Sequence, residues 1–83
     1  MKKVVIYSTR ICPYCVRAKN FFTKKDIEYT EIMIDSDIAL MREMIEKTGR
    51  KSVPQIFIGD YHVGGFDDLI EHDMDGKLEA LLN

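Results

Sequence analysis

Both cysteines of this chain lie within a four-residue stretch, where a strand pattern gives way to a helix pattern. Residues 3–7 are mostly β-branched or aromatic and predict a short buried strand. From Pro13 to about Lys25 the apolar spacing is helical, and proline suits the first helical position. The expected apolar face of this helix comprises Val16, Ala18, Phe21 and Phe22. Cys12 is then the N-cap, Cys15 lies in the first turn, and both thiols face the same end of the helix.

A second strand and a second helix are predicted after this turn. Residues 28–34 have strand alternation, and residues 35–37 offer N-caps for a helix that ends at Gly49. The expected apolar stripe of that helix comprises Ile38, Met41, Ile45 and Thr48. The chain therefore alternates between strands and helices in its first half.

The second half predicts a hairpin and a closing helix. Residues 54–58 and 61–63 have strand character on either side of a Gly-Asp turn. Helical spacing runs from Phe66 to Leu82 and is divided near Gly76. The order β-α-β-α-β-β-α predicts an α/β fold with a four-stranded mixed sheet flanked by helices, in which two strands are parallel and an edge is antiparallel. A chain of 83 residues has room for one small core, so we expect a single domain over residues 1–83.

A cysteine pair at this spacing is compatible with a redox pair, a structural staple or half of a metal site. A bridge across so short a loop removes little entropy from the unfolded chain, which disfavours a staple. Zinc needs four ligands, and only His62 and His72 remain, ten residues apart on a predicted strand and a predicted helix. We therefore expect no metal site, and we expect each histidine to have a solvated or satisfied surface role. A Cys-x-x-Cys pair that follows a strand and opens a helix is a strong redox signal.

The two thiols are expected to have different roles. Unpaired N–H groups and the positive end of the helix dipole converge on Cys12, and Arg10 is close in sequence. These features favour the thiolate and lower the pKa of Cys12 well below the free value of about 8.5. A thiol of low pKa is also a good leaving group, so Cys12 suits disulfide exchange. Cys15, nearer the core, is the expected resolving thiol.

Composition narrows the range of partners. The formal net charge is −2 and no basic run exceeds two residues, so we expect no nucleic-acid binding. No apolar stretch approaches the roughly 18 residues of a membrane span, so we expect no membrane partner. The apolar run after Lys2-Lys3 is too short for the core of a signal peptide. We expect a cytoplasmic monomer.

Three separated motifs carry a resemblance to a known family. They are Cys12-Pro13-Tyr14-Cys15, then Ser52-Val53-Pro54, then Gly64-Gly65-Phe66-Asp67-Asp68. Over nearly its whole length the chain resembles the glutaredoxins, and specifically the small dithiol glutaredoxins with a Cys-Pro-Tyr-Cys site. The second and third motifs stand in the places of that family's Thr-Val-Pro and Gly-Gly-x-Asp-Asp.

This resemblance implies a thioredoxin fold and a glutathione-disulfide oxidoreductase that reduces protein-glutathione mixed disulfides and protein disulfides. Cys12 would attack, Cys15 would resolve, and glutathione would be the reductant, itself regenerated by glutathione reductase. Ribonucleotide reductase is one protein substrate that the resemblance suggests. In this family the proline of the second motif follows a cis peptide bond, which turns the backbone of Val53 toward the active cysteine. The expected glutathione contacts are Arg10, Tyr14, Ser52, Val53, Pro54, Gly65, Phe66, Asp67 and Asp68.

The chain departs from the family pattern at two positions. Thr9 stands where the family usually has lysine, and Met41 stands where it usually has glutamine or arginine. Both family residues would hold the glycyl carboxylate of glutathione. Arg10, Arg42, Arg50 and Lys51 are the possible replacements, and the sequence does not rank them. Met41 itself is expected to pack in the core.

Other functions are compatible with the same motifs. A protein of this shape can be reduced by thioredoxin reductase, although the glycine-aspartate motif speaks for glutathione. An iron-sulfur scaffold using Cys12 and glutathione is the main alternative. Relatives of that kind generally have Cys-Gly-Phe-Ser and an extra loop, so Pro13 and Cys15 disfavour it. A binding module without catalysis is the remaining possibility.

Overall fold

The computed structural model describes all residues 1–83 and contains four strands and four helices. In chain order these are β1 Val4–Ser8, α1 Pro13–Lys24, β2 Thr30–Met33, α2 Ile38–Thr48, β3 Gln55–Ile58, β4 Tyr61–Gly64, α3 Phe66–Met74 and α4 Lys77–Leu82. The strands form one sheet in the order β2-β1-β3-β4. β1 pairs in parallel with β2, while the β1–β3 and β3–β4 pairs are antiparallel. The predicted mixed sheet with an antiparallel edge is confirmed.

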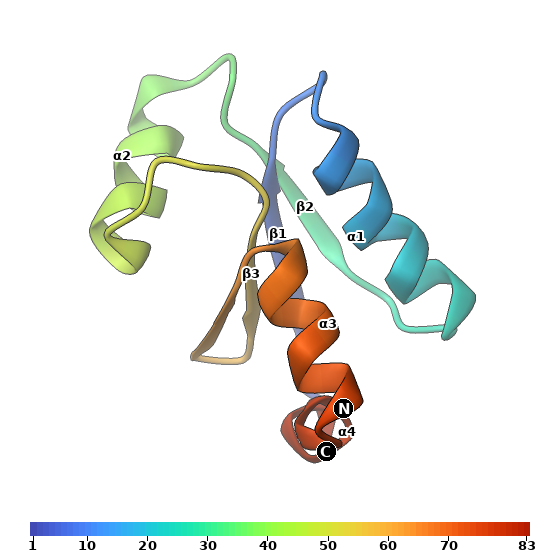
Figure 1. Ribbon diagram of the computed structural model, residues 1–83. Coiled ribbons are helices and arrows are strands. Elements are labelled where there is room, and N and C mark those ends of the chain that lie inside the picture. The colour runs from blue at the N-terminus through green and yellow to red at the C-terminus, as the bar shows by residue number, and fades with distance from the viewer.

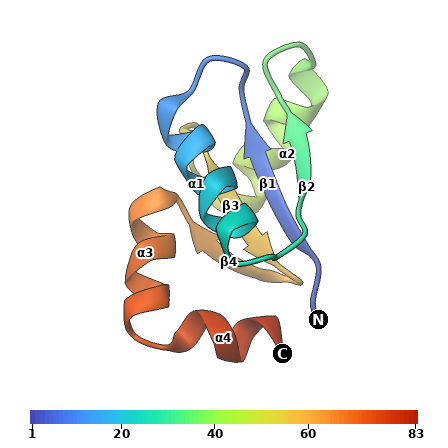
Figure 2. The same cartoon turned by 90° about the vertical axis from the view of Figure 1, so that its right-hand side faces the viewer.

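The sheet lies between two layers of helices. Helices α1, α3 and α4 cover one face, and α2 covers part of the other (Figures 1 and 2). Alternation along β1 explains the two faces, because Val4 and Ile6 pack toward α1 while Tyr7 packs toward α2. The larger cluster on the α1 side comprises Val4, Ile6, Ala18, Phe22, Ile27, Ile56, Ile58, Val63, Leu69, Leu78 and Leu82. The smaller cluster under α2 comprises Tyr7, Ile34 and Met44.

The ends of the helices follow the predicted signals. Pro13 is the first residue of α1, and Gly49 ends α2 in a left-handed conformation with φ 69°. The closing helical region is divided at Gly76, which has φ 76° and separates α3 from α4. The closing segment therefore folds as two helices, so the observed order has one helix more than β-α-β-α-β-β-α.

Three side chains that were predicted to face the core are exposed instead. Val16 was expected on the apolar face of α1, but it is 47% exposed. In α2 the expected stripe included Ile38 and Met41, which are 67% and 37% exposed, whereas Met44 is fully buried. The reason is the rotation of α2 about its own axis. The helix meets the sheet through Met44, with Leu40 and Ile45 beside it. Ile38 lies in the exposed first turn of the helix. Met41 therefore does not pack in the core.

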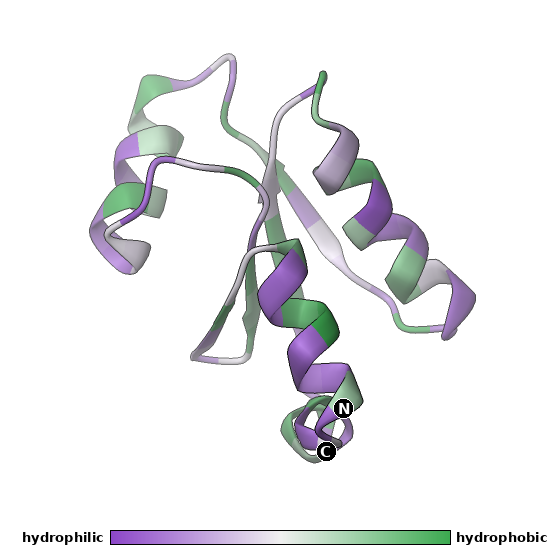
Figure 3. Ribbon diagram, viewed as in Figure 1, coloured by the Kyte–Doolittle hydropathy of each residue, from purple (hydrophilic) through white to green (hydrophobic).

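Hydropathy along the ribbon agrees with this layering. Green and purple segments alternate along α1 and α3, as expected of helices with one buried face (Figure 3). None of the helices combines the length and the apolar character that crossing a bilayer requires.

Candidate active site

Three segments that are distant in sequence meet at one end of the sheet. They are the start of α1, the loop before β3 and the start of α3 (Figures 1 and 2). β1 ends at Ser8 and its chain turns directly into the loop that carries Cys12, so this is the carboxyl end of a central strand. Ligand sites in α/β sheets form at such ends, because the loops there converge.

The cysteine pair has the geometry expected from the sequence. Cys12 is the N-cap of α1 with an extended backbone, φ −151°, and its Sγ accepts a hydrogen bond from the Cys15 backbone N–H at 3.2 Å. The two residues form a disulfide with their Cα atoms 5.2 Å apart. Cys15 is fully buried and Cys12 only half-buried. An incoming molecule can therefore reach Cys12 but not Cys15.

A groove runs beside Cys12. Its volume is about 290 Å³, and its lining comprises Tyr14, Ser52, Val53, Pro54, Gly65, Phe66, Asp67 and Asp68. All of the residues that were expected to contact glutathione, except Arg10, therefore line this one groove. The Val53–Pro54 peptide bond is cis, and the Val53 carbonyl oxygen lies 3.8 Å from Cys12 Sγ. The Tyr14 and Phe66 rings stand 6.1 Å apart between their centroids, so aromatic side chains from α1 and α3 form one wall.

Asp68 organises the α3 side of the groove. Its Oδ2 accepts a hydrogen bond from the Gly65 backbone N–H at 2.8 Å and one from Arg50 Nη1 at 3.1 Å. The Gly65 hydrogen bond lowers the pKa of Asp68, partial burial opposes that effect, and Arg50 lowers the pKa further. Gly64 has φ 115°, and a Cβ there would collide with the Asp68 carboxylate. The first glycine of the motif is therefore required for the close approach of the backbone to this carboxylate.

Arg50 is the basic residue that the structure brings to this groove. It follows the C-cap of α2, and its backbone N–H donates to Thr48 Oγ1 at 3.0 Å. Its guanidinium reaches across to Asp68 on α3 and remains about half exposed. The sequence offered four basic residues without ranking them, and this pairing is a long-range contact that no local pattern encodes.

Arg10 lies elsewhere. Its backbone N–H and its Nε both donate to Asp35 Oδ2, at 3.0 and 3.3 Å, and its side chain is 79% exposed. The sequence analysis did not identify Asp35 as the partner of Arg10, but the register of the β1–β2 pair explains the contact. Ser8 lies opposite Met33 in the parallel β1–β2 pair, so the residues two places further on are neighbours. The bond from the Arg10 backbone N–H lowers the pKa of Asp35, and the expectation that Arg10 contacts glutathione gains no support from this geometry.

Helix α1 is tied to the sheet behind the cysteines. Lys19 Nζ lies 2.8 Å from Glu31 Oε2 on β2, and the same oxygen accepts a hydrogen bond from the Ser8 hydroxyl. The Lys19 hydrogen bond, with that from Ser8, lowers the pKa of Glu31. This cluster fixes the helix that carries both thiols relative to the strand that precedes them.

Both histidines have partners within the fold. His62 Nε2 is 2.8 Å from Gln55 Oε1, and burial lowers its pKa. His72 contacts the Tyr61 hydroxyl at 2.9 Å and the Asp68 carbonyl oxygen at 2.7 Å. The expected satisfied surface roles are confirmed. No three His, Cys, Asp or Glu side chains converge in a way that could hold a metal ion.

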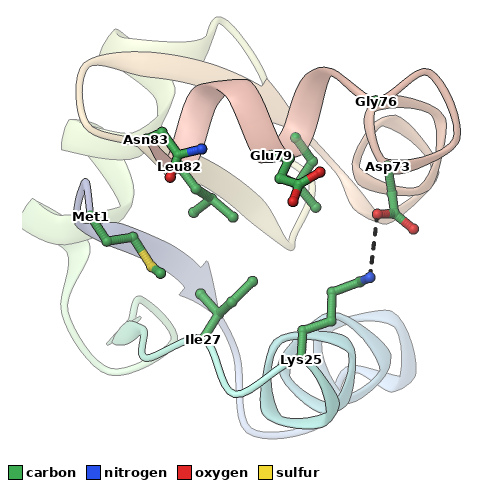
Figure 4. A pocket seen from close by; sticks show the side chains of 9 residues that line it. Met1, Lys25, Ile27, Asp73, Gly76, Glu79, Leu82 and Asn83 are labelled. Carbon is green, nitrogen blue, oxygen red and sulfur yellow. Dashed lines mark ion pairs between the residues drawn. The ribbon is translucent and has the colours of Figure 1, made fainter.

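Three larger hollows lie away from the thiols. The first, of about 540 Å³, is lined by residues 1–4 and by residues of the segment 26–30, and it contains no thiol. The remaining two lie beside ion-paired side chains. One, of about 440 Å³, lies between the chain ends and the end of α1 (Figure 4). There Lys25 Nζ pairs with Asp73 Oδ1 at 3.5 Å and joins α1 to α3. The other, of about 410 Å³, lies beside α2 and includes Tyr7, Glu43 and Lys47. Neither contains a thiol, so the smaller groove at Cys12 is the candidate redox site.

Comparison with known proteins gives a consistent result. The family model described as Glutaredoxin matches residues 4–63. The chain is 48% identical over 83 residues to a glutaredoxin of Pseudomonas aeruginosa, covering 100% of this chain and 99% of that protein. It is 46% identical over 82 residues to glutaredoxin 3 of Escherichia coli, covering 99% of each. The crystal structure of the buckwheat glutaredoxin-glutathione complex matches with a TM-score of 0.89 at 34% identity, covering 98% of this chain and 76% of that one.

Proposed function

This chain belongs to the glutaredoxin family of thiol-disulfide oxidoreductases, and on that premise we propose that glutathione is its reductant. The proposed reactions are reduction of protein-glutathione mixed disulfides and of protein disulfides. The observation that carries the proposal is the groove beside Cys12, which is lined by backbone, aromatic and acidic groups suited to a charged tripeptide. The matching buckwheat glutaredoxin, which crystallised with glutathione, supports the same ligand class.

Catalysis begins with Cys12. In the reduced protein its thiolate faces the N–H groups at the start of α1, as the 3.2 Å contact from the Cys15 backbone N–H indicates. The thiolate attacks the sulfur of glutathione in a mixed disulfide and releases the protein thiol. A second glutathione then attacks the glutathione sulfur that is bonded to Cys12. Cys12 leaves as a thiolate, which the N–H groups at the start of α1 stabilise. With a protein disulfide, the buried Cys15 displaces the substrate instead, and the Cys12–Cys15 disulfide forms.

The groove offers a receptor for each charged group of glutathione. The backbone of Val53, which lines the groove, is suited to pair with the peptide in the manner of an added strand. The start of α3 presents N–H groups to a carboxylate, and Asp68 can accept hydrogen bonds from the ammonium group. Arg50 is the cation that pairs with a residue lining the groove, Asp68, so we assign it to a glutathione carboxylate in place of Arg10.

Substitution of each cysteine tests whether reduction of a glutathione mixed disulfide needs one protein thiol or two. Cys15→Ser is expected to retain turnover of a small glutathione mixed disulfide, because that cycle needs only one protein thiol. Cys12→Ser is expected to lose all turnover. Both rates are measured by coupling to glutathione reductase and NADPH. A Cys15→Ser variant as inactive as Cys12→Ser would contradict the one-thiol cycle.

The other functions considered from the sequence gain no support. The iron-sulfur scaffold is not favoured, because Pro13 and Cys15 depart from a Cys-Gly-Phe-Ser site and the curated relatives that match over the full chain are glutaredoxins. The identity of the protein substrates, ribonucleotide reductase included, stays a prediction.

A further inference from the structure

A strip of three side chains leads away from the groove along the exposed side of α1. The Tyr14 ring is about half exposed and stands between Phe66 of α3 and Arg17 of α1. The Arg17 guanidinium carbon lies 5.1 Å from the centroid of the Tyr14 ring, within range of a cation-π contact. Arg17 does not line the groove itself, so the glutathione site leaves this cation without a role.

The charge of Arg17 is not neutralised by the protein. Helix α1 contains no acidic residue, and Arg17 forms no ion pair. Lys19 on the same helix pairs with Glu31, and Lys25 at its C-cap pairs with Asp73. Lys24 is unpaired like Arg17, but it lies in the last turn, far from Cys12 at the N-cap. The surface of α1 nearest to the reactive cysteine is therefore positive.

Apolar side chains flank the same cysteine. Ile11 directly precedes Cys12 and is 94% exposed. Val16 is 47% exposed and follows Cys12 by four residues, so it lies on the same side of the helix. A molecule that presents a disulfide to Cys12 therefore meets apolar surface and an unpaired cation beyond Tyr14.

We propose that Arg17, with Ile11 and Val16, docks an extended polypeptide whose disulfide lies close to an acidic side chain. Arg17 selects that acidic side chain by charge complementarity, while the two exposed aliphatic residues contact the flanking apolar part of the segment. The inference rests on the part of the proposed function in which Cys12 and Cys15 reduce protein disulfides. It does not depend on glutathione.

The reaction on such a segment balances within the two molecules. The Cys12 thiolate attacks one sulfur of the substrate disulfide, which breaks that bond and releases the other substrate sulfur as a thiolate. Cys15, as thiolate, then attacks Cys12 Sγ and displaces the first substrate sulfur. The substrate gains two electrons and the protein loses two, because the Cys12–Cys15 disulfide has formed. The protons lost by the protein thiols equal those taken up by the substrate thiolates.

The test uses the reduced full-length protein in a single turnover without glutathione. Three synthetic peptides share one intramolecular disulfide and differ only in a flanking residue, which is glutamate, glutamine or lysine. Acid-quenched samples are resolved by chromatography to give the rate of peptide reduction. Exposed ion pairs contribute about 0.2–1 kcal/mol, so the glutamate peptide should react about 1.4- to fivefold faster than the glutamine peptide. The lysine peptide should be slower than both, and the differences should shrink at high salt.

Variants assign the preference to Arg17. Arg17→Glu should invert the order of the glutamate and lysine peptides, and Arg17→Lys should keep the original order. Lys77→Glu is the matched control, because it changes the net charge equally on an exposed, unpaired residue of α4 at the other end of the molecule. It should leave the order unchanged. Equal rates for the three peptides, or an unaltered order in Arg17→Glu, would overturn the proposal.

A parallel measurement separates this inference from the proposed function. Turnover of a small glutathione mixed disulfide reports on glutathione dependence and carries no flanking acidic residue. Arg17→Glu should keep that turnover within about twofold of wild type. Failure of the wild-type protein in that assay would refute glutathione dependence while leaving the peptide preference intact.

Discussion

Substitution of Asp68 by asparagine probes the contact on which one side of the groove depends. The carboxylate joins the N-cap of α3 to the loop before β3 through the Gly65 N–H at 2.8 Å and Arg50 at 3.1 Å. Asparagine has nearly the same shape, and its carbonyl oxygen can still accept from the Gly65 N–H. The substitution therefore removes the charge while leaving the packing in place.

The magnitude follows from these two contacts. A hydrogen bond to a charged group contributes about 1.5–3 kcal/mol, and a neutral one about 0.5–1.5 kcal/mol. The Arg50 pair adds little, because the Asp68 side chain is 36% exposed and solvent screens exposed pairs. We expect Asp68→Asn to lower the free energy of unfolding by about 1 kcal/mol at neutral pH. For a chain of 83 residues this lowers Tm by about 4–8 °C.

The same loss has a defined pH dependence. The folded-state pKa of Asp68 lies below its usual value of 3.8. A depressed pKa means that the stability it contributes is fully present above the usual value and is lost as the pH falls through the folded-state pKa. Asparagine does not titrate in this range, so the difference between wild type and variant should shrink in acid.

Urea unfolding of the oxidised protein, followed by circular dichroism at several pH values, measures both effects. Asp67→Asn is the matched control, since it removes one charge from the same helical turn where the side chain makes no hydrogen bond. It should cost less than half as much as Asp68→Asn. Equal costs for the two variants, or a difference that persists unchanged in strong acid, would refute the reasoning.

Other substitutions test neighbouring parts of the structure. Gly64→Ala should destabilise the protein by about 1–3 kcal/mol in urea unfolding, because φ is 115° and the new Cβ meets the Asp68 carboxylate. Tyr7→Phe should cost about 1 kcal/mol in the same assay, because its buried hydroxyl donates to Glu43 at 2.7 Å; no loss would contradict that contact. Arg10→Ala should leave KM for glutathione within about twofold of wild type in the coupled assay, because an ion pair holds its guanidinium outside the groove and exposed pairs contribute little. A large rise in KM would show instead that Arg10 contacts glutathione.

Local signals explain why most of the fold could be predicted. Pro13, Gly49 and Gly76 mark helix boundaries through backbone chemistry that acts within a few residues, and each boundary was found. The cysteine turn was predictable for the same reason, since Cys12 and Cys15 belong to one helical turn. Which side of a helix faces the core is harder to predict from local signals. Met44, rather than Met41, faces the sheet because of where α2 docks, and docking depends on the whole core.

The charged contacts of the site were harder to predict because they join distant segments. Arg50 and Asp68 are 18 residues apart and meet only because the loop before β3 and the start of α3 converge. Arg10 and Asp35 are 25 residues apart and meet through the register of two parallel strands. Motifs identified the groove by residue type, whereas assigning a cation to it needed the three-dimensional structure.

Glutathione dependence is tested most directly by steady-state turnover of a small glutathione mixed disulfide by the wild-type protein. One reaction supplies glutathione, glutathione reductase and NADPH, and the other supplies thioredoxin reductase and NADPH. We expect NADPH consumption that rises with protein concentration in the first reaction and none above background in the second. Turnover only with thioredoxin reductase, or in neither reaction, would contradict this expectation.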